Sequence, residues 1–353
     1  MLSFGGCVDH DLGNLPIVFL FVGQGSQYFR MGSELFHTHR IFREWMHTGD
    51  CLVRDRFGFS VIDAIQGQGR LLSDPFDRLS ATHPAIFLTE YALAQVLQHH
   101  GIFPDSVLGV SLGETVAMTV ADMLSFEPAL LSVAQQPGIF SQTCSPGRMV
   151  TVLADPALHG GNPVLATHSE LVGTGAARHC VLAAPATALP VIGKELARLF
   201  LPHQTLPVPF AFHSRWIEPS EPAYRAATAA LHLRKPRWPV FSTALQRRSG
   251  PDGFDLPPDE LLWQIVRGPM RIGEMLLGIE AAGGAIYVDL SPSGTLAGFA
   301  RRAMEAGSPS RVFPLLNPFG EDLCCIARLL DAIRPAGYPA LQTALVAERS
   351  PAA

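Results

Sequence analysis

The sequence predicts an α/β fold built around a parallel sheet, and two alternating kinds of segment indicate it. Residues 16–22 and 107–110 are short apolar runs that each lead into a glycine-containing turn. Such runs are typical of strands buried on both faces of a parallel sheet. Residues 84–98, which lie between them, carry apolar side chains at helical spacing. The resulting strand, helix, strand order is that of an α/β unit.

Length and composition restrict the class of protein further. With 353 residues, 48% of them apolar, the chain can bury a large core and can hold a smaller domain inserted in a larger one. A net charge of −5 and the lack of a basic, aromatic-interleaved segment argue against a nucleic-acid partner. No stretch has the length of a membrane span, and residues 1–14 do not resemble a targeting signal, so we expect a cytoplasmic protein without a membrane partner. The cysteine spacing does not suit zinc, so we expect no metal.

The turn at residues 109–113 carries the clearest chemical signal. An apolar run, the pattern Gly109-x-Ser111-x-Gly113 and a helix-like segment at 114–122 follow one another, which is the order of a nucleophile elbow. Such a turn holds the serine in a strained conformation with its Oγ raised, and small neighbours supply the room. The alternative is a glycine-rich turn that merely contains a serine.

A second glycine-containing turn, at residues 23–27, follows the first apolar run and precedes a helical stretch at 33–47. It lacks the third spaced glycine of a dinucleotide-binding turn and the lysine of a P-loop. Nucleotide binding is therefore disfavoured.

Several motifs in one order resemble a known family. They are residues 19–27, 82–85, 109–114, 147–153, 210–214, 266–270 and 288–296. Together they look like the acyltransferase family of malonyl-CoA:acyl-carrier-protein transacylases and trans-acting polyketide-synthase acyltransferases. The resemblance implies an α/β-hydrolase-like large subdomain with a parallel sheet (residues 16–145 and 209–320) and an inserted small ferredoxin-like subdomain (146–208). Residues 1–15 would form an N-terminal extension, and 321–353 a C-terminal helix with a mobile tail.

Local patterns agree with this division. We expect short strands around a helix at 189–200; the strands are residues 149–154, 180–184 and 205–208. This order of elements differs from that of the parallel sheet. Residues 240–244 and 285–290 are expected as further strands of the large sheet, and 323–333 as a helix.

The resemblance also implies a site. A serine hydroxyl needs a base within hydrogen-bond reach, and His213 matches the family's histidine, so we expect a Ser111–His213 dyad. The imidazole would be oriented by a main-chain carbonyl, which the alignment puts at Arg271. The main-chain N–H groups of Gln24 and Leu112 would form the oxyanion hole.

Departures from the family pattern bear on the acyl group. Relatives that take malonyl carry an arginine that clamps the free carboxylate, whereas this chain has Gln136 there, or Gln135 under a one-residue slip, followed by Pro137. We therefore expect an acyl group without a charged end. His83 replaces the usual glutamine, and with Gln136 and Phe212 it is expected to select the acyl group. Val110 and Gly175 are further departures in the pocket.

Three classes of function were considered. The first is an enzyme that takes a non-carboxylated acyl group from an acyl-carrier-protein thioester through acyl-Ser111. Within it we favour a proofreading acyl hydrolase over an acyltransferase that passes a neutral acyl group between carrier proteins or from CoA, and over a malonyl transacylase. The second is a plain esterase in which Asp155 completes a triad, and the third is a docking module without activity.

The favoured class implies its partners. The acyl donor would be the phosphopantetheine arm of an acyl carrier protein, or CoA, with no bound cofactor. Arg215, Arg301 and Arg302 are expected at the rim of the active site, where guanidinium groups suit an acidic carrier and its phosphate. We expect a monomer.

Overall fold

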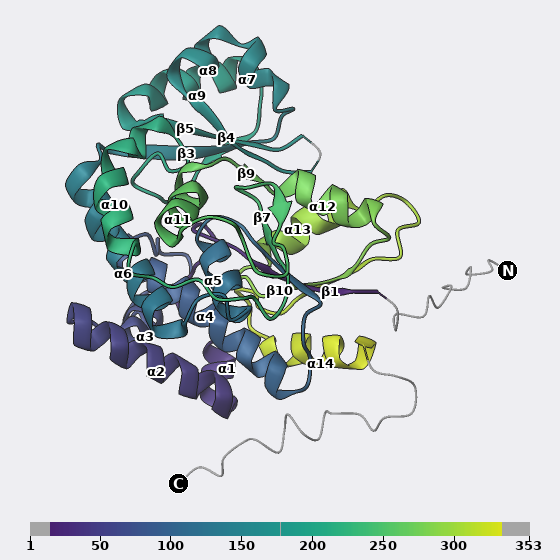
Figure 1. Cartoon of the computed structure of the whole chain (residues 1–353). Helices are drawn as coiled ribbons and strands as arrows, with labels where there is room; N and C mark the ends of the chain where they lie inside the picture. The colour runs from purple at the N-terminus through teal and green to yellow at the C-terminus, as the bar shows by residue number, and fades with distance from the viewer. Residues whose placement is uncertain (1–14, 177, 334–353) are drawn as a thin grey trace, which may run out of the picture.

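The computed structural model describes residues 15–176 and 178–333, which form two lobes, each built on its own sheet (Figure 1). The predicted mobile tail beyond residue 333 and residues 1–14 of the predicted N-terminal extension lie outside the described residues. No helix of the described ranges is long and apolar enough to cross a membrane.

The large lobe contains the predicted parallel sheet. Its strand order is β11-β10-β1-β2-β7-β8, and every neighbouring pair from β11 to β7 is parallel, whereas β8 pairs antiparallel to β7. The strands are β1 (Ile17–Phe21), β2 (Ser106–Gly109), β7 (Val240–Ser242), β8 (Arg247–Arg248), β10 (Ile286–Asp289) and β11 (Arg311–Pro314). The edge strand β11 was not anticipated.

Helices cover both faces of this sheet, which explains why its strands are apolar without alternation. In β1, Val18 and Leu20 pack against α12 (Ile272–Ala281) and α13 (Thr295–Ala303). Phe19 and Phe21 point to the opposite face, into the core formed with α4 (Leu79–His99), α5 (Leu112–Val120) and α6 (Phe126–Thr143). A strand buried on both sides gains apolar contact from every residue.

The remaining elements of the large lobe surround this core. They are α1 (Ser33–Thr38), α2 (Arg40–Phe57), α3 (Val61–Gln66), the 3₁₀ helix η3 (Arg215–Ser220), α10 (Glu221–Thr228), α11 (Pro258–Arg267) and α14 (Asp322–Ile333). The helix expected at 33–47 is two helices, because His39 adopts an extended conformation (φ −110°, ψ 114°) between them. Helix α3 was not anticipated within its polar surroundings.

The small lobe has the predicted ferredoxin-like topology. Its strands are β3 (Gly147–Val152), β4 (Glu170–Thr174), β5 (Cys180–Pro185) and β6 (His203–Thr205), and its helices are α7 (Ala157–Gly161), α8 (Pro163–His168), the 3₁₀ helix η2 (Ala186–Ala188) and α9 (Leu189–Arg198). The four strands are antiparallel in the order β6-β3-β5-β4, as in a β-α-β-β-α-β unit. Strand β4 was missed, and β6 begins two residues earlier than expected.

One strand joins the lobes. β9 (Met270–Arg271) follows α11 of the large lobe and pairs in parallel with β4 of the small sheet. The Arg271 amide of β9 donates to the Thr243 carbonyl, just after β7 of the large sheet, at 3.3 Å, so this strand contacts both lobes.

We expect Gly113→Ala to destabilise the protein, because a Cβ at this position would lie 2.3 Å from the carbonyl oxygen of Phe21 on the neighbouring strand β1. Overpacking of this kind costs about 1–3 kcal/mol. Gly138→Ala is the matched control, since a Cβ there meets nothing within 4 Å and alanine raises helix stability by up to about 1 kcal/mol. Urea unfolding of both variants tests this, and equal effects would contradict the close approach.

Candidate active site

Ser111 lies at the junction between β2 and α5, where the sequence predicted an elbow. Its backbone has φ 57° and ψ −127°, a positive φ that a non-glycine residue adopts only when its surroundings impose it. A Cβ at Gly109 would lie 2.3 Å from the Cα of Glu114, so the glycine allows the strand to fold back tightly against the helix. The Ser111 hydroxyl is thereby raised above the sheet.

His213 lies beside this serine. The Ser111 Oγ and the His213 Nε2 are 2.8 Å apart, and the His213 Nδ1 is 2.8 Å from the carbonyl oxygen of Gly268. The histidine is 3% exposed and has φ 63°, and its amide donates to the Val266 carbonyl at 3.2 Å. Both ring nitrogens are therefore engaged in a fixed geometry.

The expectation that Arg271 supplies the orienting carbonyl was wrong. Gly268 ends α11, and a C-terminal helix carbonyl has no intrahelical donor, so it is free to accept from the imidazole. Arg271 lies three residues further on in β9, where its amide donates to Thr243 at 3.3 Å. Because the His213 Nδ1 donates to Gly268, it is not available to Asp155, whose carboxylate accepts from the Ala157 amide; this excludes the Asp155 triad.

The environment keeps His213 neutral. Its pKa is lowered from 6.5 to about 4, mainly by burial and to a smaller extent by Arg267, against the opposing effect of the hydrogen bond to the Gly268 carbonyl. At neutral pH the ring therefore carries one proton. Because the Gly268 carbonyl can only accept, this proton is on Nδ1, and the Nε2 lone pair faces the Ser111 hydroxyl. Such a ring can take the serine proton during attack.

The predicted oxyanion loop lies against the elbow. A Cβ at Gly23 would be 3.0 Å from the Ser111 Cβ and 3.1 Å from the Leu112 nitrogen. Leu112 opens α5, where first-turn amides have no intrahelical acceptor. The next loop residue, Gln24, is fixed through its side chain, whose Oε1 accepts from the Thr82 hydroxyl at 3.0 Å. This proximity suits an oxyanion hole, and the assignment of the two amides stays a prediction.

A cavity of about 260 Å³ opens beside Ser111 and His213. The three side chains predicted to select the acyl group, Gln136, Phe212 and His83, all line it. Val110 and Gly175, two other departures, line it as well, and so do Tyr224, Phe299 and His179. No arginine or lysine is among the described residues that line it. The cavity thus offers no cation to a carboxylate.

Of the two glutamines that could occupy the position of the family's arginine, only Gln136 is buried at the cavity. Gln136 is 6% exposed and its Nε2 donates to the Tyr224 hydroxyl at 3.2 Å, whereas Gln135 is exposed to solvent. Helix α6 continues through Pro137 without ending. A side chain at position 136 therefore points into the cavity.

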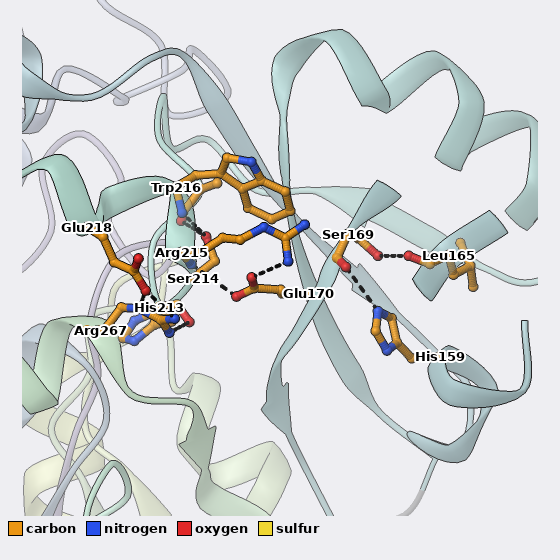
Figure 2. A network of polar contacts seen from close by, with 11 residues as sticks. His159, Leu165, Ser169, Glu170, His213, Ser214, Arg215, Trp216, Glu218 and Arg267 are labelled. Carbon is orange, nitrogen blue, oxygen red and sulfur yellow. Dashed lines mark hydrogen bonds and ion pairs between the residues drawn. The ribbon is translucent and has the colours of Figure 1, made fainter. Parts of the chain in front are cut away.

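The three arginines expected at the rim lie in different settings. Arg215 reaches from the segment after His213 to Glu170 on β4, at 2.7 Å, and so ties the two lobes together (Figure 2). Arg302 is exposed, and its guanidinium lies 5.6 Å from the ring centre of Phe299, a cavity residue. Arg301 is exposed at the end of α13.

Sequence reasoning missed the group that anchors the elbow. Glu114 is 1% exposed, and its carboxylate accepts from the Ser242 hydroxyl at 2.5 Å, the Thr243 hydroxyl at 2.7 Å and the Ala244 amide at 2.9 Å. These bonds attach the first turn of α5 to the end of β7. The glutamate directly follows the elbow in sequence, but its partners are about 130 residues away and left no local signal. Gly268 and Tyr224 were missed for the same reason.

A raised serine hydroxyl bonded to a neutral imidazole is the arrangement with which α/β-hydrolase-like enzymes attack acyl groups. Comparison with models of protein families then identifies the family. Residues 18–334 match the acyl transferase domain, so the chain belongs to this family and is an acyltransferase-family enzyme.

Individual relatives agree with this assignment. The chain is 41% identical over 320 residues to the polyketide biosynthesis acyltransferase homolog BaeD of Bacillus velezensis, covering 91% of this chain and 97% of that protein. It is 36% identical over 310 residues to the homolog PksD of Bacillus subtilis, covering 88% and 94%.

Solved structures show the same fold. A loading acyltransferase of the avermectin polyketide synthase matches with a TM-score of 0.80 at 22% identity, over 90% of this chain and all of that one. A malonyl-CoA:acyl carrier protein transacylase from Clostridium perfringens matches with a TM-score of 0.75 at 21% identity, over 90% and 97%.

We expect Glu114→Gln to flatten the pH dependence of stability. Burial raises the pKa of Glu114 from 4.5 to about 7, so the folded state holds this proton more tightly than the unfolded state. The wild type therefore loses unfolding free energy as the pH rises between these values, and the glutamine variant lacks this loss. Melting temperatures at pH 5 and pH 8 measure it. Glu127→Gln, at an exposed position in α6, is the control, and an identical pH dependence of all three proteins would contradict the prediction.

Proposed function

We propose that this protein is a Ser–His enzyme of polyketide-type biosynthesis that removes a non-carboxylated acyl group from an acyl-carrier-protein thioester, with water as the acceptor. The observation that carries the proposal is the cavity beside Ser111, which presents Gln136 and no arginine or lysine among its described lining residues. A carboxylate entering such a cavity would lose its hydration without gaining an opposite charge, at a cost of several kcal/mol. A neutral acyl group incurs no such cost.

The reaction proceeds in two steps. The Ser111 Oγ attacks the thioester carbonyl while the His213 Nε2 accepts the serine proton, and that proton then passes to the departing thiol of the phosphopantetheine arm. The C–S bond breaks and an ester forms on Ser111. In the second step the same nitrogen takes a proton from water, which attacks the ester, and Ser111 regains its proton as the free acid leaves. The amides of Gln24 and Leu112 stabilise the oxyanion in both steps.

A second candidate is transfer of a neutral acyl group to another thiol. The names of BaeD and PksD, which describe acyltransferase homologs, favour it. Its first step is the same, and only the acceptor differs: a second carrier-protein thiol would take the acyl group in place of water.

The donor is a carrier protein rather than a freely diffusing ester. Carrier proteins are acidic and bear a phosphate on their arm, and guanidinium groups suit both features. Arg302 supports this role because it lies over Phe299 at the cavity, and Arg301 precedes it on the same exposed helix end. Arg215 contributes less, since Glu170 already balances its charge. CoA is the alternative donor, and the active unit is the monomer.

We expect wild-type protein mixed with acetyl-carrier protein to form acetyl-Ser111, which decays in water. Ser111→Ala abolishes the adduct, and His213→Ala slows its formation by about 10²–10⁴-fold, because general-base catalysis contributes that much. Intact-protein mass spectrometry over time measures both. An adduct on the alanine variant of Ser111 would refute the nucleophile. An adduct that persists in water and disappears only when a second carrier thiol is added would favour the transferase.

We expect Gln136→Arg to admit malonyl. The new guanidinium would face the cavity from an uninterrupted helix, and a charge-assisted pair of about 1.5–3 kcal/mol corresponds to roughly 10–150-fold. Competition between malonyl- and acetyl-carrier protein measures the ratio of the two adducts. Gln136→Met, which alters the Tyr224 hydrogen bond without adding charge, is the matched control. The neutral-acyl proposal fails if the wild type already takes malonyl as readily as acetyl.

A further inference from the structure

Helix α4 makes two hydrogen bonds to the segment that carries the predicted oxyanion amide of Gln24. In its first turn, the Thr82 hydroxyl donates to the Gln24 Oε1 at 3.0 Å. About two helical turns later, the Glu90 Oε1 accepts from the Val22 main-chain amide at 2.9 Å. Positions with this spacing lie on one face of a helix. One face of α4 therefore contacts the segment on both sides of Gly23.

The Val22 amide lies where strand β1 has just ended. The Leu20 carbonyl still accepts from the Leu290 amide at 3.0 Å, and Leu20 and Asp289 are the last registered pair of β1 and β10. Backbone groups two residues apart on a parallel strand face the same neighbour. The Val22 amide thus faces the side on which this ladder has ended, and the Glu90 carboxyl supplies its acceptor there.

The same segment lies against the elbow. A Cβ at Gly113 would be 2.7 Å from the Val22 nitrogen, and a Cβ at Gly23 would be 3.1 Å from the Leu112 nitrogen. The Val22 amide is therefore packed between α4 on one side and the first turn of α5 on the other. Because Gln24 follows two residues later, a shift of the chain at Val22 would also move the Gln24 amide.

Glu90 acts from outside the cavity. It is fully buried and is not among the described residues that line the cavity, whereas Val22 and Gln24 are. Burial raises the pKa of Glu90 well above its usual value, and the charge of Asp289 raises it too, against the opposing effect of the bond to Val22. The uncharged carboxyl, whose carbonyl oxygen accepts hydrogen bonds, is thereby favoured. Such a group can hold the backbone of the loop without touching the acyl group.

We propose that Glu90 and Thr82 are positioning residues that hold the Gln24 amide opposite the Leu112 amide, Glu90 through the main chain at Val22 and Thr82 through the Gln24 side chain. The direction of this amide matters because preorganised donors stabilise an oxyanion only when they already point at it. This inference rests on the proposed function, since it takes the Gln24 amide as an oxyanion donor.

The test follows formation and decay of acetyl-Ser111 in single turnovers, with the acceptor that the wild type uses. Glu90→Met has a side chain of similar length but offers no oxygen to the Val22 amide. We expect both rate constants to fall by about 10–100-fold, part of the 10²–10³-fold lost when an oxyanion donor is removed outright. Both steps are affected because each passes through an oxyanion. The carrier-protein concentration that gives the half-maximal rate of adduct formation stays unchanged, because Glu90 does not line the cavity.

Two further variants separate positioning from packing. Glu90→Gln presents an amide oxygen that can accept from the Val22 amide, and it restores most of the rate lost in Glu90→Met. Thr89→Val is the matched control, because Thr89 is buried beside Glu90 in α4 and its hydroxyl has no hydrogen-bond partner among the described residues. We expect wild-type rate constants for this variant. The final yield of adduct gives the active fraction of each protein, so a loss of folded protein is not counted as a loss of rate.

Thr82→Val tests the second contact and carries the test if Glu90→Met does not fold. It removes the bond to the Gln24 Oε1 with little change of shape, and we expect both rate constants to fall several-fold. Thr82→Ser keeps the hydroxyl and recovers the rate. Because both contacts act on one loop, the double variant Glu90→Met/Thr82→Val loses less than the product of the two single losses.

The outcomes distinguish this inference from the proposed function. If the wild type forms no adduct on Ser111, the proposed function fails. If the adduct forms and decays but Glu90→Met and Thr82→Val both keep wild-type rate constants, only the positioning role is refuted. A loss confined to one of the two steps, or a loss in Glu90→Met that Glu90→Gln does not restore, also refutes it. A changed pH dependence of adduct formation in Glu90→Met would place the effect on His213 and would refute it as well.

Discussion

The buried carboxylate of Glu114 is the contact on which the geometry of the site depends. It accepts three hydrogen bonds from consecutive residues at the end of β7 and is itself in the first turn of α5. It thereby holds the helix that begins at the elbow against the strand next to β2. Ser111 can keep its unfavourable backbone conformation because α5 is fixed in this way and because the Thr243 hydroxyl donates to the Gly109 carbonyl at the end of β2, at 3.2 Å.

The protonation state of the base depends on the exclusion of water from the site. His213 stays neutral because it is buried, and its orientation is set by a carbonyl that the end of α11 leaves free. The described residues that line the cavity include no arginine or lysine, so a carboxylate there would lose hydration without gaining an opposite charge from them. Gln136, His83 and Gln24 are uncharged polar residues that line the same cavity.

The site also depends on contacts between the lobes. Strand β9 adds to the small sheet immediately after Gly268, and Arg215 pairs with Glu170 immediately after His213. The segments that carry the imidazole and its carbonyl are therefore each bonded to the small lobe; Figure 2 shows the Arg215–Glu170 pair beside His213. A ferredoxin-like insertion, in this arrangement, completes the wall of the cavity and also holds the base in position.

The sequence by itself determined the elements whose cause is local. Continuous apolar runs marked the parallel strands, since a strand buried on both faces has no polar positions, and Gly109 and Gly113 marked the elbow, since only small residues fit there. The motif around His213 and the glutamine at 136 were also visible in the chain. These features predicted the fold and the place of the serine, and the glutamine at 136 led to the proposal of a neutral acyl group.

Only the tertiary structure decided the partners of these residues. Gly268, and not Arg271, bonds to His213, and Tyr224 bonds to Gln136; these partners are 55 and 88 residues apart in the chain. Their identity depends on where a helix ends and on which helices pack together. Spacing along a chain records none of these, because a hydrogen bond depends on the distance between atoms and not on their separation in sequence.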